Sequence, residues 1–254
     1  MNELKSRVLT ALAGHFPDKS FSFDNLKVLH KGRFANAVVL RYQDDDLDLV
    51  IKDFSHCPWP IRRTAGRFFI GREAKAMTRL KGIDGVVPDC YQLNELMLAY
   101  PFIEGESLRA VKESGTQLPR RFFVELERMV AEMHRRGVVH LDLRNLGNVL
   151  LGHDGKPHFI DFQSSMSYSR FPNWVQGFMR GADLSGVYKA WEKVCDEPLS
   201  AHRARFFDNY NILRKRWIFR GYPLTRTANK MRSAGAQLAL AGGEVLRNMF
   251  ERIF

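Results

Sequence analysis

The sequence predicts an α+β protein with a β-rich N-terminal lobe and a mainly helical, shortened C-terminal lobe. Three observations lead to this prediction. Short β-branched runs separated by turn residues follow one another between residues 26 and 54. Stretches with helical periodicity dominate the chain after residue 118. Within that second region, the stretch 138–165 combines short apolar runs with a cluster of polar side chains.

The composition is that of a globular protein, with 45% hydrophobic and 26% charged residues in a chain of 254. We expect a single domain whose lobes are 1–102 and 103–254, the second ending in a basic helical tail from about residue 200. No apolar run approaches the roughly 20 residues of a membrane span. The first 16 residues resemble a short amphipathic helix rather than a signal peptide. Three scattered cysteines form no even disulfide set, which favours a cytoplasmic protein.

The charge is strongly basic, with a formal net charge of +11 and a pI near 9.8. Such an excess attracts polyanions. The expected partner is therefore nucleic acid, an anionic membrane face or a phosphorylated substrate, and charge alone does not choose among them.

The stretch VVHLDLRNLGNVLLGHDGKPHFIDFQSS is predicted to be a hairpin with oxygen-bearing side chains at both ends. Asp142 and Asn148 precede its first apolar run, and Asp161 follows its second. Carboxylate and carboxamide oxygens are hard ligands that suit Mg²⁺, and a carboxylate is also a candidate base. Chemistry on a magnesium-bound polyphosphate needs this combination. The alternative is an ordinary hairpin with incidental acidic residues.

Three motifs in this stretch resemble the catalytic and metal-binding motifs of the protein-kinase-like superfamily: His140-Leu-Asp142, Asn148 and Asp161-Phe162-Gln163. The resemblance implies a two-lobed kinase fold with ATP and Mg²⁺ as cofactors. It implies that Asp142 orients and deprotonates an acceptor hydroxyl, and that Asn148 and Asp161 hold Mg²⁺ across the ATP phosphates. Arg144 is expected to neutralise the charge that develops near the transferred group. A structural, bracing role is expected for His140.

Two departures from the family pattern stand out. Gln163 replaces the glycine that usually follows Asp-Phe, and six positions separate Asp142 from Asn148 where the family has five. The extra residue lies within the loop 144–147. A catalytically impaired relative therefore remains an alternative.

The N-terminal runs KVLH, AVVLRY and DLVIKDF predict three antiparallel strands. In a kinase-like protein Lys52 stands on the third of them, where Val-Ile before it buries the stem and directs the ammonium inward. The phosphate-covering loop is a poor match, since it keeps one glycine. Its expected cofactor contacts are Gly32, Phe34, Ala37 and Val39.

A helix is predicted from Gly71 to Leu80. The resemblance implies that Glu73 on this helix forms an ion pair with Lys52, which then holds the α- and β-phosphates. The alternative is that Glu73 only complements the helix N-terminus, worth about 0.3–1 kcal/mol.

Further elements follow in order. Residues 86–88 and 96–100 are predicted strands, and FIEGESL resembles the hinge that joins kinase lobes. Backbone groups of Tyr100 and Phe102 are expected to face adenine. An amphipathic helix is predicted from Pro119 to Arg136, with Gly137 ending it.

The region after Ser165 lacks the long activation segment of typical protein kinases and has a helix predicted within 173–194, with Asp183 as a candidate cap of its second part. This shortened lobe resembles RIO-type kinases, lipopolysaccharide-core (Kdo or heptose) kinases and aminoglycoside phosphotransferases. Between Arg203 and Arg232 nine basic residues stand against one acid. A solvated basic face and docking to an anionic partner explain them equally well. A further helix is predicted over 228–254.

The predicted function is transfer of the ATP γ-phosphoryl group to a hydroxyl. A lipopolysaccharide-core sugar and a protein or ribonucleoprotein are both candidate acceptors; an aminoglycoside fits the basic tail less well. A glycolipid acceptor would imply peripheral contact with the inner face of the membrane. Two alternatives come from other classes of protein. One is a pseudokinase or nucleotide-gated binding protein, and the other is a basic nucleic-acid-binding protein.

Overall fold

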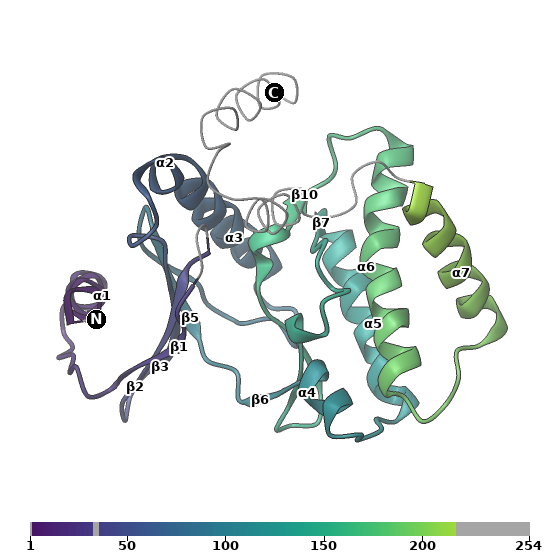
Figure 1. The fold of residues 1–254 in the computed structure, drawn as a ribbon, viewed down its shortest axis with the longest axis horizontal. Coiled ribbons are helices and arrows are strands. Elements are labelled where there is room, and N and C mark those ends of the chain that lie inside the picture. Colours follow the sequence, from purple (N-terminus) through teal and green to yellow (C-terminus); the bar gives the residue numbers. More distant parts are fainter. Residues whose placement is uncertain (1, 33–35, 217–254) are drawn as a thin grey trace, which may run out of the picture. The chain divides into compact units, whose positions relative to one another are not determined.

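A computed structural model of the protein describes residues 2–32 and 36–216, and every structural statement below concerns these residues. Residues 1–207 form one compact unit and residues 208–254 a second. The described part of the chain has a β-rich N-terminal region followed by a mainly helical region, which confirms the predicted α+β fold (Figure 1).

The N-terminal region is built on a five-stranded antiparallel sheet with strand order β1-β2-β3-β5-β4. Its strands are β1 (Leu26–His30), β2 (Val38–Gln43), β3 (Asp48–Asp53), β4 (Tyr91–Asn94) and β5 (Met97–Pro101). The three predicted N-terminal strands are therefore present, and a short connection at residues 44–47 joins the second to the third. The predicted strand at 96–100 corresponds to β5, whereas β4 was not predicted.

Two helices lie on opposite sides of this sheet (Figure 1). Helix α1 (Asn2–His15) buries Val8, Leu9 and Leu12 against alternate residues of the strands, which gives a separate small core. Helix α3 (Arg67–Leu80) packs on the other side and joins the larger core. It is preceded by α2 (Trp59–Ile61) and by η1 (Arg62–Gly66), a π-helical turn. The predicted helix at 71–80 thus starts four residues earlier.

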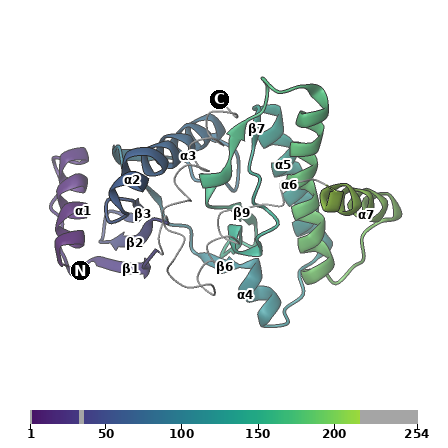
Figure 2. The same cartoon turned by 45° about the horizontal axis from the view of Figure 1, so that its top comes forward.

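The helical region begins with α4 (Leu108–Glu113) and the longer α5 (Arg120–Arg135). Pro119 is the N-cap of α5 and Gly137 follows its end with φ 74°, so both predicted boundaries are confirmed. The predicted apolar stripe is buried in full: Phe122, Phe123, Leu126, Met129, Val130 and Met133. Helix α6 (Asn173–Val194) packs along α5, and α7 (Ala201–Arg216) follows it (Figure 2).

Short strands connect the two regions. β6 (Gly105–Ser107), β8 (Val149–Gly152) and β9 (Pro157–Phe159) form one sheet, and β7 (Val138–Val139) pairs with β10 (Met166–Ser167). The predicted hairpin is therefore β8–β9 alone, because Val138 and Val139 pair outside it. The 3-10 turns η2 (Leu146–Asn148) and η3 (Phe162–Ser164) flank this hairpin.

Three sequence predictions need comment here. Residues 86–88 form no strand, because Val86 makes only an isolated bridge to Phe159. Asp183 does not cap a helix, since α6 runs unbroken through it. The helix predicted at 228–254 lies outside the described residues.

Candidate active site

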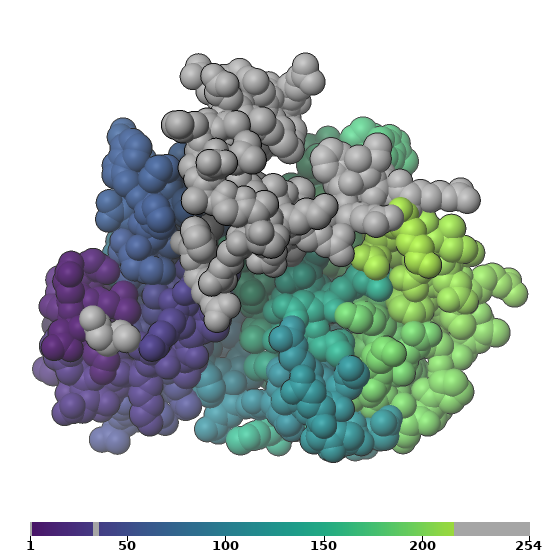
Figure 3. Space-filling view, in the orientation of Figure 1, coloured from purple at the N-terminus to yellow at the C-terminus, as the bar shows by residue number. Residues whose placement is uncertain are grey.

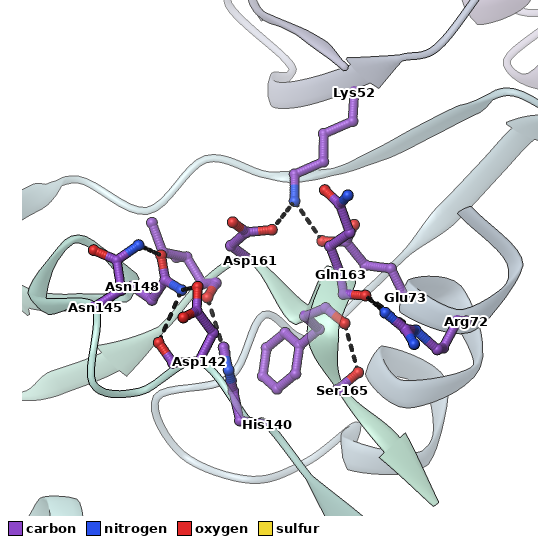
Figure 4. A network of polar contacts seen from close by, with 12 residues as sticks. Lys52, Arg72, Glu73, His140, Asp142, Asn145, Asn148, Asp161, Gln163 and Ser165 are labelled. Atoms are coloured by element: carbon purple, nitrogen blue, oxygen red, sulfur yellow. Dashed lines mark hydrogen bonds and ion pairs between the residues drawn. The ribbon is translucent and has the colours of Figure 1, made fainter. Parts of the chain in front are cut away.

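Lys52 on β3 lies at the centre of a buried network of charges (Figure 4). Its Nζ lies 2.7 Å from Glu73 Oε1 on α3 and 2.7 Å from Asp161 Oδ1, which follows β9. Lys52 is 5% exposed and Glu73 is 1% exposed, whereas the Asp161 side chain keeps 40% of its surface open. The ion pair between Lys52 and Glu73 that the sequence predicted is therefore present. Asp161 joins the pair from a position 109 residues further along the chain.

Burial and neighbouring charges oppose each other in this network. Burial acts to lower the pKa of the Lys52 ammonium, but the Glu73 and Asp161 carboxylates outweigh it and raise that pKa well above its usual value. Burial acts to raise the pKa of Asp161, but Lys52 outweighs it and holds that pKa below its usual value. Burial prevails at Glu73, whose pKa is raised. We infer a stable ammonium held between two carboxyl groups at neutral pH.

The loop before β8 brings Asp142 and Asn148 together. Asn148 Nδ2 donates to Asp142 Oδ2 at 2.8 Å and to the Asp142 carbonyl at 3.1 Å. Burial raises the pKa of Asp142, and the hydrogen bond from Asn148 only partly offsets this rise. A carboxylate with a raised pKa is a better proton acceptor, as a general base requires.

Asn145 has a defined place in the lengthened loop 144–147. It caps η2 by accepting from the Gly147 N–H, and its Nδ2 donates to Asn148 Oδ1 at 3.2 Å. Its Oδ1 also accepts from Arg109 of α4 at 2.6 Å. Asn145 thus orders this loop and orients the Asn148 side chain. Neither Asn145 nor Arg109 was singled out from the sequence, because their pairing depends on the fold.

Helix α6 fixes the backbone on the other side of this loop. Asp183 is fully buried, and its two oxygens accept from the His140 N–H at 2.8 Å and the Leu141 N–H at 2.7 Å. Leu141 has φ 65°, in the left-handed region that non-glycine residues avoid. His140 Nε2 lies 3.1 Å from the Ile160 carbonyl, which fits its predicted bracing role. These contacts hold the strained backbone of Leu141, and with it the neighbouring Asp142, in place. A strained backbone at a functional site persists only when the surrounding structure supports it.

Arg144 lies elsewhere than the sequence predicted. Its Nη1 donates to Ser185 Oγ at 2.9 Å, and its guanidinium carbon lies 5.6 Å from the centre of the Phe207 ring. The side chain is therefore directed toward α6, and Arg144 is absent from the residues that line the cavity described below. Among the described residues, Lys52 and Arg109 are the arginine and lysine side chains that line this cavity.

Gln163 occupies the position where a glycine was expected, and its backbone conformation explains why none is needed. Among the described non-glycine residues only Leu141 and Asp161 have a positive φ, so Gln163 is unstrained in η3. Its carbonyl accepts hydrogen bonds from Arg72, the residue before Glu73 (Figure 4). This contact ties α3 to the segment that carries Asp161.

A cavity of about 470 Å³ opens beside these groups, a volume typical of small-molecule sites. It brings together six residues predicted to contact cofactor or metal, namely Val39, Lys52, Tyr100, Phe102, Asn148 and Asp161. It is also lined by residues that the sequence did not single out, among them His30, Ile103, Ser107 and Arg109. The N–H of Phe102 donates to the Asp48 carbonyl at 2.9 Å, so this N–H is used by the sheet and not by a ligand.

The predicted phosphate-covering loop is described only in part. Gly32 has φ 58°, and a Cβ there would lie 2.5 Å from the Asn36 carbonyl oxygen, so this turn requires glycine. Gly32 and Ala37 do not line the cavity, and Phe34 lies outside the described residues.

The donor set fits Mg²⁺ held jointly with a nucleotide. No group of three or more His, Cys, Asp or Glu side chains suited to a metal occurs among the described residues. Asp161 and Asn148 line the same cavity, and Mg²⁺ commonly binds one or two protein oxygens with phosphates supplying the rest. No helix in the described range is long and apolar enough to cross a membrane.

Comparison with known proteins gives two matches. The family model described as the RIO domain matches residues 45–202, more than half of the chain. The chain is also similar to the KEOPS complex subunit Bud32 of Pyrococcus abyssi, with 29% identity over 126 residues. That match covers 48% of this chain and 54% of the relative, so this chain spans about half the length of that protein.

Proposed function

The chain belongs to the RIO domain family of protein-kinase-like proteins, and on that premise we propose that it transfers the γ-phosphoryl group of ATP to a hydroxyl. One observation carries the proposal. Lys52 Nζ bridges Glu73 and Asp161 at 2.7 Å each, at the wall of a cavity that Asn148 also lines. The cavity would receive ATP between an N-terminal lobe ending near Phe102 and a C-terminal lobe beginning near Ile103.

Each residue has a distinct role in this proposal. Asp161 and Asn148 would hold Mg²⁺, which as a Lewis acid neutralises charge on the phosphate oxygens. The Lys52 ammonium, kept charged by Glu73, would bind phosphate oxygens. Asp142 would orient the acceptor hydroxyl and accept its proton, because its partly buried carboxylate has a raised pKa. Asn148, which donates to Asp142, would keep that carboxylate directed at the acceptor.

The acceptor we favour is a protein hydroxyl. The RIO family match supports a protein acceptor over a lipopolysaccharide-core sugar, and the similar relative is itself named as a subunit of a complex. We therefore propose a protein or ribonucleoprotein partner and a cytoplasmic location. A glycolipid acceptor at the inner membrane face is the second candidate, since the net charge of +11 would also favour it.

The activity is tested by measuring ATP turnover, as hydrolysis or autophosphorylation, with and without Mg²⁺. We expect slow Mg-dependent turnover by the wild type and none by Asp161→Ala. Arg121→Gln is the control, because Arg121 is exposed on α5 and does not line the cavity, and it should turn over ATP as the wild type does. Equal turnover by wild type and Asp161→Ala would refute the proposed site.

The acceptor is tested separately. Radiolabelled γ-phosphate would be offered with a panel of proteins and, in parallel, with lipopolysaccharide-core lipids. We expect label on protein. Label on the lipid alone would replace the favoured acceptor by the second candidate and leave the proposed chemistry intact.

A further inference from the structure

The segment 55–72, which includes α2, η1 and the start of α3, is basic and aromatic. It contains four arginines and no acidic residue. Trp59 in α2 is 61% exposed, and Phe68 in the first turn of α3 is 52% exposed. Amphipathic aromatic side chains such as tryptophan are enriched at interfaces.

Gly66 explains how this segment takes its shape. A Cβ at Gly66 would lie 3.2 Å from both Phe54 Cβ and Leu96 Cδ2, so glycine allows the helix to pack closely against the sheet. The turn that ends at Gly66 is π-helical, a feature often found at functional sites. As a result Arg62, Arg63 and Arg67 surround a hollow of about 420 Å³, with Trp59 and Leu96 completing its wall.

The charge in this hollow is only partly neutralised. Arg67 pairs with Glu95 at 2.5 Å. The guanidinium of Arg63 lies 5.4 Å from the centre of the Trp59 ring, and Arg62 makes a long hydrogen bond of 3.4 Å to the Ser55 carbonyl. Within residues 2–32 and 36–216, no carboxylate forms an ion pair with Arg62 or Arg63. The hollow is therefore suited to an anion, and guanidinium groups bind phosphate well.

A second exposed aromatic group lies at the start of α6. Trp174, in the first turn of α6, is 66% exposed, and Phe171 just before it is 38% exposed. Arg170 precedes them and is exposed as well. Figures 1 and 3 show α2 at the upper left and the N-terminal end of α6 at the upper right of the same view. This group is separate from the hollow, and the binding surface inferred below is confined to the α2–η1 segment.

We propose that the α2–η1 segment binds the surface of an anionic phospholipid bilayer. The hollow formed by Arg62, Arg63 and Arg67 takes a lipid phosphate, and Trp59 inserts at the level of the headgroups. Exposed tryptophan beside arginine is the combination that membrane interfaces favour, through the amphipathic ring and the negative surface potential. The proposal does not depend on phosphotransfer, since none of these side chains lines the nucleotide cavity.

The test is sedimentation of the full-length chain with phosphatidylcholine vesicles, with and without phosphatidylglycerol. The variant Arg62→Gln/Arg63→Gln should bind the anionic vesicles about 25-fold more weakly than the wild type, since each basic residue near the surface contributes on the order of a fivefold effect. The matched control is Arg121→Gln/Arg128→Gln. It removes the same charge from exposed positions on α5 and should bind as the wild type does.

Tryptophan insertion gives a second readout on the same vesicles. Brominated lipid should quench part of the fluorescence of the wild type, and Trp59→Phe should remove a share of that quenching. Trp191, which is 1% exposed, serves as an internal reference that lipid does not reach.

Three results would overturn the proposal. The arginine variant and the control could bind vesicles equally, which would mean that only net charge matters. Inorganic phosphate could bind through Arg62 and Arg63 while vesicle binding stays unchanged, which would mark a soluble-ligand site. Single-stranded RNA could bind through Trp59 and the arginines without any loss of vesicle binding in the variant, which would identify a different macromolecule.

Discussion

At the scale of single residues, the site rests on side chains that are far apart in sequence. Lys52, Asn148 and Asp161 line one cavity, Glu73 pairs with Lys52, and Asp142 accepts a hydrogen bond from Asn148. Lys52, Glu73, Asp142, Asn148 and Asp161 could be found from the sequence because their residue types and spacings follow a known pattern. The chemistry of Lys52 depends on two carboxylates together, since either alone would leave a buried charge poorly compensated. The pKa of Asp142 depends on a different balance, in which burial raises it by more than the hydrogen bond from Asn148 lowers it.

The raised pKa of Asp142 gives a prediction on pH. Only the carboxylate form of Asp142 can accept a proton, so turnover should fall as pH decreases through its pKa. Because burial raises that pKa above the ordinary value of 3.8, the loss should begin at a higher pH than an exposed aspartate would give. The measurement is the pH dependence of ATP turnover at saturating Mg-ATP. An acid limb at or below the ordinary value would contradict the assigned role.

Asp183 gives a prediction on stability. Asp183→Ala leaves the buried N–H groups of His140 and Leu141 without their acceptor, so the free energy of unfolding should fall by about 3 kcal/mol or more. Turnover should fall as well, because Asp142 directly follows Leu141 in the chain. Denaturant unfolding measures the first effect. Asp45→Ala, at an exposed turn, is the control and should change the unfolding free energy by less than about 0.5 kcal/mol. A stable Asp183→Ala variant would show that α6 does not anchor the loop.

Some site residues could not be predicted from the sequence. Arg109 and Asn145 meet only because α4 packs beside the catalytic loop, and Arg144 turns toward Ser185 for a similar tertiary reason. A signal for the α6 contact did exist. Asp183, Ser185 and Gly186 are poor helix formers in the middle of a long helix, and such a cluster indicates that contacts outside the helix decide the residue types.

At the scale of elements, the strands and helices with clear periodicity were predictable, and the elements defined by long-range pairing were not. The stripe of α5 and the three N-terminal strands matched their predictions because local pattern decides them. Strands β7 and β10 have two residues each and exist only because they pair with one another across 27 residues. The strand predicted at 86–88 is absent for the converse reason. Apart from one bridge, no neighbouring strand pairs with these residues.

The approach of α6 to the catalytic loop gives a prediction at this scale. A Cβ at Gly186 would lie 2.6 Å from the backbone carbon of Leu143 and 2.9 Å from the Arg144 nitrogen. Gly186→Ala should therefore displace the loop, lower the free energy of unfolding by about 1–3 kcal/mol and reduce turnover. Gly177→Ala in the same helix is the matched control. Gly177 has no atom within 4 Å of an added Cβ, so alanine there should be neutral or stabilising by up to about 1 kcal/mol. Equal effects of the two changes would contradict the proposed close contact.

At the scale of the whole molecule, the sequence predicted an α+β protein of kinase type, and the fold and the family match confirm it. The division into lobes near residue 102 stays a prediction, because the larger core includes residues from both sides of it, such as Ile70 and Phe123. Patterns of charge predicted an anionic partner but not its identity. The proposed surface at α2 and η1 assigns one such partner to a specific segment, which composition alone could not locate.

The central claim is that this cavity binds Mg-ATP and that Asp142 then drives phosphoryl transfer. The most direct measurement compares Asp142→Asn with the wild type for two quantities, the affinity for Mg-ATP and the rate of ATP turnover. We predict that Asp142→Asn binds Mg-ATP as the wild type does and loses turnover by at least about a hundredfold, the usual contribution of a general base. Binding by both proteins with no turnover by either would contradict the claim and identify a nucleotide-gated binding protein.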